Sequence, residues 1–137
     1  MSEQTNIQTI QRAYECFGQG NVAGVLSELT SDVVWHVAPV AGVSYTGTRN
    51  GQAGAGEFFA GLVEAEDVLK FEPREFIAQG DKVAVIGSYG GRVKTTGREY
   101  ETYWIHVFAM RDGKIARFDE YTDTAAIAAA FVKAQTA

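Results

Sequence analysis

Cysteine, histidine and proline are scarce in this 137-residue sequence, which contains one, two and two of them. The lone Cys16 cannot form an internal disulfide, which fits a reducing compartment. One cysteine and two histidines do not supply a usual set of zinc ligands. We therefore expect no metal site and no cofactor.

Basic residues are also in the minority. The 12 lysines and arginines stand against 17 aspartates and glutamates, and no basic stripe marks a nucleic-acid surface. No segment approaches the roughly 20 apolar residues of a membrane span, and the N-terminus lacks the apolar core of a signal peptide. We expect a soluble, cytoplasmic protein with no nucleic acid and no membrane as partner.

The sequence is rich enough in apolar residues for one core. Hydrophobic residues make up 46% and charged residues 21%, which is typical of a compact globular chain. Neither an internal repeat nor a linker divides it. A single domain over residues 1–137 is therefore expected.

Apolar periodicity and turn residues predict the order of the elements. The predicted helices are Thr5–Gly18, a short one after Asn21, one from about 51 to 66, and Thr124–Lys133; the predicted strands are Val33–Val37 and the hairpins Leu69–Lys94 and Glu99–Thr122. Gly87, Gly90 and Gly91 indicate a bend or bulge in the first hairpin. This order predicts an α+β fold: a cone-shaped, strongly bent, mostly antiparallel sheet with N-terminal helices packed on its concave face.

The hairpin Glu99–Thr122 carries the best functional lead. Val, Ile, Phe, Tyr and Trp dominate both arms, yet His106 lies in the middle of the first arm. Two carboxylates, Asp119 and Glu120, lie near the end of the second arm. A titratable pair inside an apolar hairpin is a candidate for proton-transfer chemistry.

The turn decides which carboxylate faces His106, because side chains alternate along a strand. A two-residue loop at Asp112-Gly113 places Asp119 on the face of His106. A three-residue loop over 111–113, with Gly113 in a bulge, places Glu120 there instead. Both faces of the first arm are apolar, so the pattern alone leaves both open.

Several segments resemble the nuclear-transport-factor-2-like superfamily, and within it the SnoaL-like polyketide cyclases of the ketosteroid-isomerase-like family. They are Tyr14-x-x-Phe17-x-x-Gly20-Asn21, Asp32-Val33-Val34-Trp35, Arg111-Asp112-Gly113-Lys114-Ile115 and Glu120-Tyr121-Thr122-Asp123. The resemblance implies that a bulged hairpin directs His106 and Glu120 into the cone. SnoaL-like cyclases carry a histidine and an acid at this spacing, and the acid, usually aspartate, is the general base.

These residues and the resemblance together suggest a function. We expect a cofactor-independent cyclase, isomerase or lyase that acts on a small apolar carbonyl compound, with Glu120 as general base and His106 as its partner. The alternatives are a non-catalytic binding protein for a small hydrophobic ligand and a structural dimerisation module. In these, Glu120 is solvated or bonded to the backbone, and His106 is a core residue.

Side chains predicted to line the cone suit a small hydrophobic or aromatic ligand, because aromatic walls stack on flat rings. The predicted ligand-binding residues are Tyr14, Trp35, Val37, Tyr89, Thr102, Trp104 and Phe118. The outer sheet face also carries apolar residues, including Tyr103 and Ile105. Such a face usually meets a partner, and the resemblance implies a homodimer through it.

Overall fold

The computed structural model describes residues 2–133. Helices and strands follow one another in separate runs, with four consecutive strands after the third helix, as is typical of an α+β fold. The predicted class is confirmed. The elements are α1 (Glu3–Gly18), α2 (Val22–Ser27), β1 (Leu29–Val37), β2 (Gly47–Asn50), α3 (Gly51–Ala65), β3 (Glu66–Gln79), β4 (Lys82–Val93), β5 (Glu99–Arg111), β6 (Lys114–Thr122) and α4 (Thr124–Phe131).

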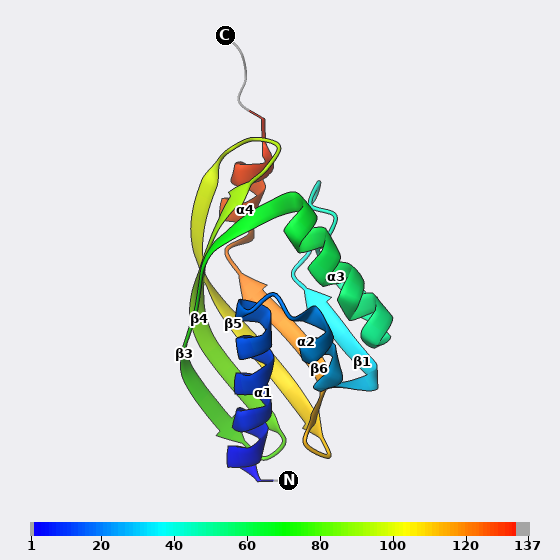
Figure 1. The fold of residues 1–137 in the computed structure, drawn as a ribbon. Helices are drawn as coiled ribbons and strands as arrows, with labels where there is room; N and C mark the ends of the chain where they lie inside the picture. Colours follow the sequence, from blue (N-terminus) through cyan, green and yellow to red (C-terminus); the bar gives the residue numbers. More distant parts are fainter. Residues whose placement is uncertain (1, 134–137) are drawn as a thin grey trace.

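The strands form one curved, open sheet in the order β2-β1-β6-β5-β4-β3. Neighbouring strands are antiparallel except β1 and β6, which are parallel. Figure 1 shows α1 running along the face of the sheet and α3 lying across the β1 side. Because these helices cover the concave face, the core lies between them and the sheet.

Several boundaries differ from the prediction. The first helix begins at Glu3 rather than Thr5, because the Ser2 hydroxyl accepts a hydrogen bond from the Thr5 N–H and caps it. The first strand begins earlier, at Leu29, and the last helix ends earlier, at Phe131. The short strand β2 lacks an apolar pattern of its own and was not predicted; it forms because β1 offers it a free edge.

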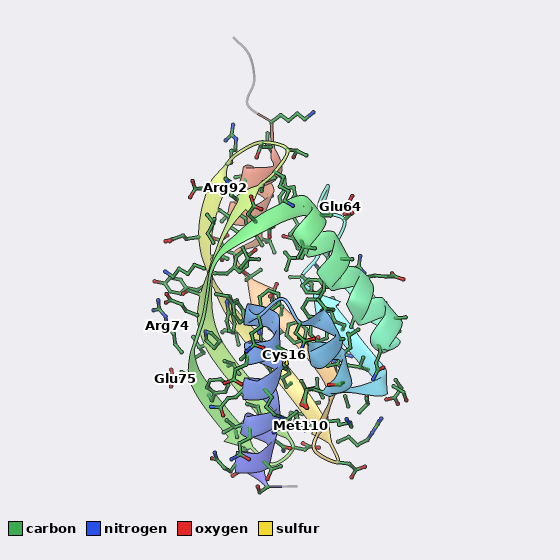
Figure 2. All side chains as sticks on the ribbon, in the orientation of Figure 1. Cys16, Glu64, Arg74, Glu75, Arg92 and Met110 are labelled. Carbon is green, nitrogen blue, oxygen red and sulfur yellow. The ribbon has the colours of Figure 1, made fainter. Side chains whose placement is uncertain are left out.

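The bulge that the glycines of β4 indicated is present in this hairpin. The bulges opposite them lie in β3, where Leu69 and Arg74 have no partner in the ladder with β4. Gly87 instead makes room for a side chain, since it pairs with Trp104 and a Cβ there would overlap the indole ring. Figure 2 shows Arg74 pointing away from the helices on the outer side of β3.

Within residues 2–133, no helix is long and apolar enough to cross a membrane. On the outer face of the sheet, Tyr103 is 73% exposed and Ile105 is 42% exposed. The neighbouring strand adds Tyr121, which pairs with Ile105 and is 55% exposed. The outer face is therefore apolar as well as accessible.

Candidate functional site

The turn between β5 and β6 has two residues. Asp112 and Gly113 both have positive φ, 53° and 78°, as a type I′ turn requires. Arg111 consequently pairs with Lys114. Of the two loops that the sequence pattern left open, the two-residue loop is the one that forms. The three-residue loop of the bulged hairpin is wrong.

Although the loop has two residues, Glu120 is the carboxylate that faces His106. Ala109 pairs with Arg117 while Met110 pairs with Ile115, so one residue of β6 is extra and the register shifts by one. Beyond this bulge, at residue 116, His106 pairs directly with Glu120. The resemblance therefore implied the right carboxylate, but the bulge lies within β6 and not in the turn.

Asp119 lies on the opposite face of β6 from Glu120. It pairs with Val107 across the ladder. Its two carboxylate oxygens accept hydrogen bonds from Arg117 at 2.8 and 3.0 Å. The other histidine, His36, also lies outside the site, where its Nδ1 is 2.7 Å from the Thr48 hydroxyl.

A chain of hydrogen bonds runs from α1 through β5 to β6. The Tyr14 hydroxyl lies 2.9 Å from His106 Nδ1, and His106 Nε2 lies 2.9 Å from Glu120 Oε2. A carboxylate can only accept, so Nε2 carries the imidazole proton when Glu120 is ionised. Nδ1 of the neutral ring then accepts from the Tyr14 hydroxyl, and each donor has its acceptor.

Burial favours the uncharged forms of Tyr14 and His106, the first two members of this hydrogen-bond chain. Desolvation lowers the pKa of His106 below its ordinary value, against the hydrogen bond and charge of Glu120, which raise it. Burial and the charge of Glu120 raise the pKa of Tyr14 well above its ordinary value. The tyrosine therefore remains an O–H donor, and the imidazole favours the uncharged form.

These residues lie around one cavity of about 90 Å³. It is lined by every side chain predicted to be catalytic or ligand-binding: Tyr14, Trp35, Val37, Tyr89, Thr102, Trp104, His106, Phe118 and Glu120. The walls are mainly aromatic. Trp104 stacks on His106 with ring centres 3.8 Å apart, and Trp35 stacks on Phe118 at 3.9 Å.

Two donors in these walls lack partners. The indole rings of Trp35 and Trp104 are 5% and 2% exposed. Neither indole N–H has a hydrogen-bond partner within residues 2–133. A buried donor without an acceptor costs about 1–3 kcal/mol. The two N–H groups are therefore enclosed by the packing around the rings and carry this cost in the folded protein.

Sequence reasoning missed a second polar group that lines the same cavity. We call it the Glu66 cluster, and its members are Glu66, Tyr45, Tyr89 and Tyr100. Tyr45 and Tyr89 donate to Glu66 Oε1 at 3.1 and 2.9 Å. Tyr100 lies 2.8 Å from Oε1 and 2.9 Å from Oε2. Glu66 is 2% exposed, so a carboxyl is held inside the protein by three phenols.

Burial dominates the electrostatics of the cluster. Desolvation raises the pKa of Glu66, against its hydrogen bonds to the tyrosines, which lower it. The charge of Glu120 contributes to the same rise, which couples the two carboxyl groups of the cavity. Burial also raises the pKa of Tyr100 far above its ordinary value, so this phenol stays a donor.

One of the missed residues had a signal in the sequence. Tyr100 alternates with Thr102, Trp104 and His106, so it belongs to the same inward face of β5. Glu66 had no such signal, because it stands where α3 ends and β3 begins and neither periodicity applies. Among residues 2–133, no three His, Cys, Asp or Glu side chains gather as a metal ion would require.

Comparison with known proteins matches residues 10–118 to the SnoaL-like domain family. The chain belongs to this family. A nuclear-transport-factor-2-like protein from Burkholderia xenovorans is 33% identical, with a TM-score of 0.87 over 96% of this chain and 99% of that one. A protein of unknown function from Burkholderia pseudomallei is 26% identical, with the same TM-score and coverage.

A third similar structure comes from a co-crystallisation. It is TerC, co-crystallised with polyporic acid, and it is 33% identical to this chain. The TM-score is 0.82, over 92% of this chain and 97% of TerC. No match was found among curated proteins. The fold and family of this SnoaL-like protein are therefore shown, and its reaction is not.

The pairing in this SnoaL-like protein predicts how His106 titrates. Glu120→Gln removes the charge and weakens the bond that raise the pKa of His106, so we expect that pKa to fall further in the variant. NMR titration of the imidazole protons measures it, with His36→Gln for assignment. Asp119→Asn is the matched control, because Asp119 lies on the opposite face; an equal effect in both variants would contradict the pairing.

Proposed function

We propose that this SnoaL-like protein is an enzyme of the cyclase, isomerase or lyase type that acts on a small apolar carbonyl compound. Glu120 is the general base and His106 its partner. One observation carries the proposal: His106 Nε2 lies 2.9 Å from Glu120 Oε2 inside a cavity with mainly apolar walls. A carboxylate positioned in apolar surroundings suits removal of a proton next to a carbonyl group.

The hydrogen-bond chain supports a division of roles between the oxygens of Glu120. His106 holds Oε2, so we assign proton transfer to Oε1. The C–H bond of the substrate breaks, its electron pair enters the adjacent carbonyl as an enolate, and Oε1 takes the proton. Return of that proton to another carbon completes an isomerisation. Attack of the enolate on a second carbonyl carbon closes a ring: the new C–C bond forms as the π bond of that carbonyl breaks, and its oxygen takes the proton from Oε1.

Tyr14 has a positioning role in this proposal. Its hydroxyl donates to His106 Nδ1, which sets the ring tautomer in which Nε2–H points to Glu120. His106 is buried and Tyr14 is half-buried against the core, so packing restricts the rotation of both side chains. The carboxylate is thus held ready before the substrate binds, which lowers the cost of ordering it.

The ligand is proposed to be a small hydrophobic or aromatic molecule. The cavity walls are mainly tryptophan, tyrosine and phenylalanine rings, and the cavity volume is about 90 Å³. The relative TerC was co-crystallised with polyporic acid, which supports an organic ligand here too. Within the cavity, we assign ligand contacts to Trp35, Trp104 and Phe118, with Tyr14, Val37, Tyr89 and Thr102 completing the wall.

Hydrogen–deuterium exchange at a ketone tests the proposal. Acetophenone is a flat apolar ketone whose methyl protons lie next to the carbonyl. Incubation with the protein in D₂O should accelerate loss of the methyl signal, followed by proton NMR. Binding without acceleration would count against the enzyme and favour a non-catalytic binding protein, which uses the same apolar cavity.

We further propose a homodimer through the outer face of the sheet. The exposed apolar side chains of Tyr103, Ile105 and Tyr121 support this interface, because such a face is stabilised by burial. Ile105→Asp should give a monomer in sedimentation equilibrium, since the charge would be buried without a partner. A parent protein that sediments as a monomer at every concentration would contradict it.

A further inference from the structure

We infer that a surface groove bounded by α1, α3 and β3 is the entrance of the cavity, and that the rings of Phe17 and Phe71 close it and select by size what enters. The inference goes beyond the proposed function, since it concerns access and depends neither on the reaction nor on the class of ligand. Two observations carry it: a single layer of side chains separates the groove from the cavity, and the groove offers space into which a ring of that layer can rotate.

The groove lies where the last turns of α1 approach the corner between α3 and β3. Its volume is about 930 Å³, and its lining includes Gly18 of α1, Val63 of α3 and Leu69 of β3. Val63 is 52% exposed and Leu69 is 46% exposed, so solvent reaches the groove. In Figure 1 the upper end of α1 lies below the arch by which α3 passes into β3.

A single layer of side chains divides the groove from the cavity. Its five members line both: Tyr14, Phe17, Phe59, Glu66 and Phe71. Three of the five are fixed. Tyr14 is held by its hydrogen bond to His106 at 2.9 Å, Glu66 is held by three phenols, and Phe59 is only 5% exposed. Passage through the layer therefore depends on the other two rings.

Phe17 and Phe71 are half-buried and are held by ring contacts alone. Their ring centres lie 5.0 Å apart in an edge-to-face arrangement, and Phe71 also stacks on Trp104 at 5.2 Å. The backbone at both residues is fixed, because the Phe17 carbonyl accepts from the Gly20 N–H at 3.0 Å and Phe71 pairs with Tyr89 in the sheet. The aperture therefore opens by side-chain rotation, and Phe17 has the groove to rotate into.

The surroundings of the two rings are more firmly held. On the opposite rim of the groove, Lys94 Nζ donates to the Val63 carbonyl at 2.7 Å and ties the end of α3 to the segment after β4. At the other end of the cavity, Ile127 of α4 is 5% exposed. The Thr96 hydroxyl donates to the Ala130 carbonyl at 2.7 Å and anchors α4 there. Entry beside α4 would break this bond, whereas entry from the groove requires only a ring rotation.

Quenching of tryptophan fluorescence by acrylamide tests the inference without a ligand. The sequence has two tryptophans, Trp35 and Trp104, and both line the cavity and are 5% and 2% exposed. A neutral quencher therefore has to enter in order to reach them. We expect Phe17→Ala to raise the quenching rate constant at least about threefold, because no ring has to rotate before the quencher passes. An unchanged constant would overturn the inference.

Two further variants show whether the effect belongs to the entrance. Phe76→Ala removes another ring of β3, which lies 6.1 Å from the Tyr14 ring but lines neither the groove nor the cavity, so its constant should match the parent. Ile127→Ala trims the wall at the α4 end and should raise the constant less than Phe17→Ala does. An equal rise in Phe76→Ala would indicate general loosening, and a larger rise in Ile127→Ala would place the entrance at α4. Either result would overturn the inference.

Phe17→Leu decides if Phe17→Ala does not fold. Leucine keeps an apolar contact at this position but is smaller than the ring, so the constant should still rise about twofold. A constant equal to that of the parent in this folded variant would contradict the inference.

Selection by size is tested with a second quencher. Succinimide is neutral, like acrylamide, but larger, so the closed layer should hinder it more. The ratio of the acrylamide constant to the succinimide constant should fall by about half or more in Phe17→Ala, because the widened aperture admits both. A ratio equal to that of the parent would refute the selection by size. Neither measurement involves a ketone or proton removal by Glu120, so failure of the entrance and failure of the proposed enzyme are distinguishable.

Discussion

Replacing Glu120 with glutamine should slow deuterium exchange at the methyl group of acetophenone by about 10²- to 10⁴-fold, the usual contribution of a general base. The amide has the same shape as the carboxylate but cannot take up the proton. His106 would still lie opposite residue 120 in the ladder, because the backbone pairing does not depend on the side chain. Exchange rates are measured by proton NMR in D₂O for both proteins.

The control for this prediction lies one residue away. Asp119→Asn also removes one negative charge from β6, but Asp119 lies on the other face and is held by Arg117. Exchange in this variant should match the parent. Affinity for acetophenone, measured by chemical-shift titration, should change less than threefold in Glu120→Gln, since the ring packs on the aromatic walls. A loss of exchange in both variants, or of ligand binding in Glu120→Gln, would contradict the assigned role.

Gly87→Ala should lower the free energy of unfolding by about 1–3 kcal/mol, as overpacking of a filled core does. The added Cβ would overlap the Trp104 indole and lie 2.5 Å from the carbonyl oxygen of Glu72. Since Trp104 stacks on His106, displacement of the indole should also move the imidazole resonances. Urea denaturation gives the stability, and NMR spectra report on the ring.

Gly90→Ala is the matched control in the same strand. Its nearest neighbour would be Lys70 Cβ at 3.4 Å, an ordinary van der Waals contact, so no side chain has to move. We expect a change in unfolding free energy below about 0.5 kcal/mol, as at most unconstrained positions. Equal destabilisation by both substitutions would show that the strand, and not the Trp104 contact, requires glycine.

The sequence by itself determined the features that depend on local periodicity and turn chemistry. Alternation along β5 placed Thr102, Trp104 and His106 on one face, because successive side chains of a strand point to opposite sides. The Asp112-Gly113 pair located the turn and allowed a two-residue loop, because these residues adopt positive φ angles readily, but it also fitted a three-residue loop. These features made the α+β class predictable, whereas the inward direction of the His106 face was implied only by the resemblance.

Only the tertiary structure decided which carboxylate joins His106. Ile115 is 1% exposed, pairs with Leu29 at the start of β1, and donates its N–H to the carbonyl of Glu28 at 2.9 Å. Ile115 and Glu120 are five residues apart, so a regular strand would point them to opposite faces. The extra residue at 116 lets the side chains of Ile115 and Glu120 both point inward. It is required because Ile115 packs against the start of β1, which is distant in sequence.

The Glu66 cluster was likewise decided by tertiary packing. Its tyrosines come from the loop before β2, from β4 and from β5, and they reach Glu66 from 21 to 34 residues away in the chain. A glutamate beside a helix end resembles a solvated charge in the sequence, and most such residues are exposed. It becomes a buried acceptor because the bent sheet and α3 bring three phenols to one carboxyl group.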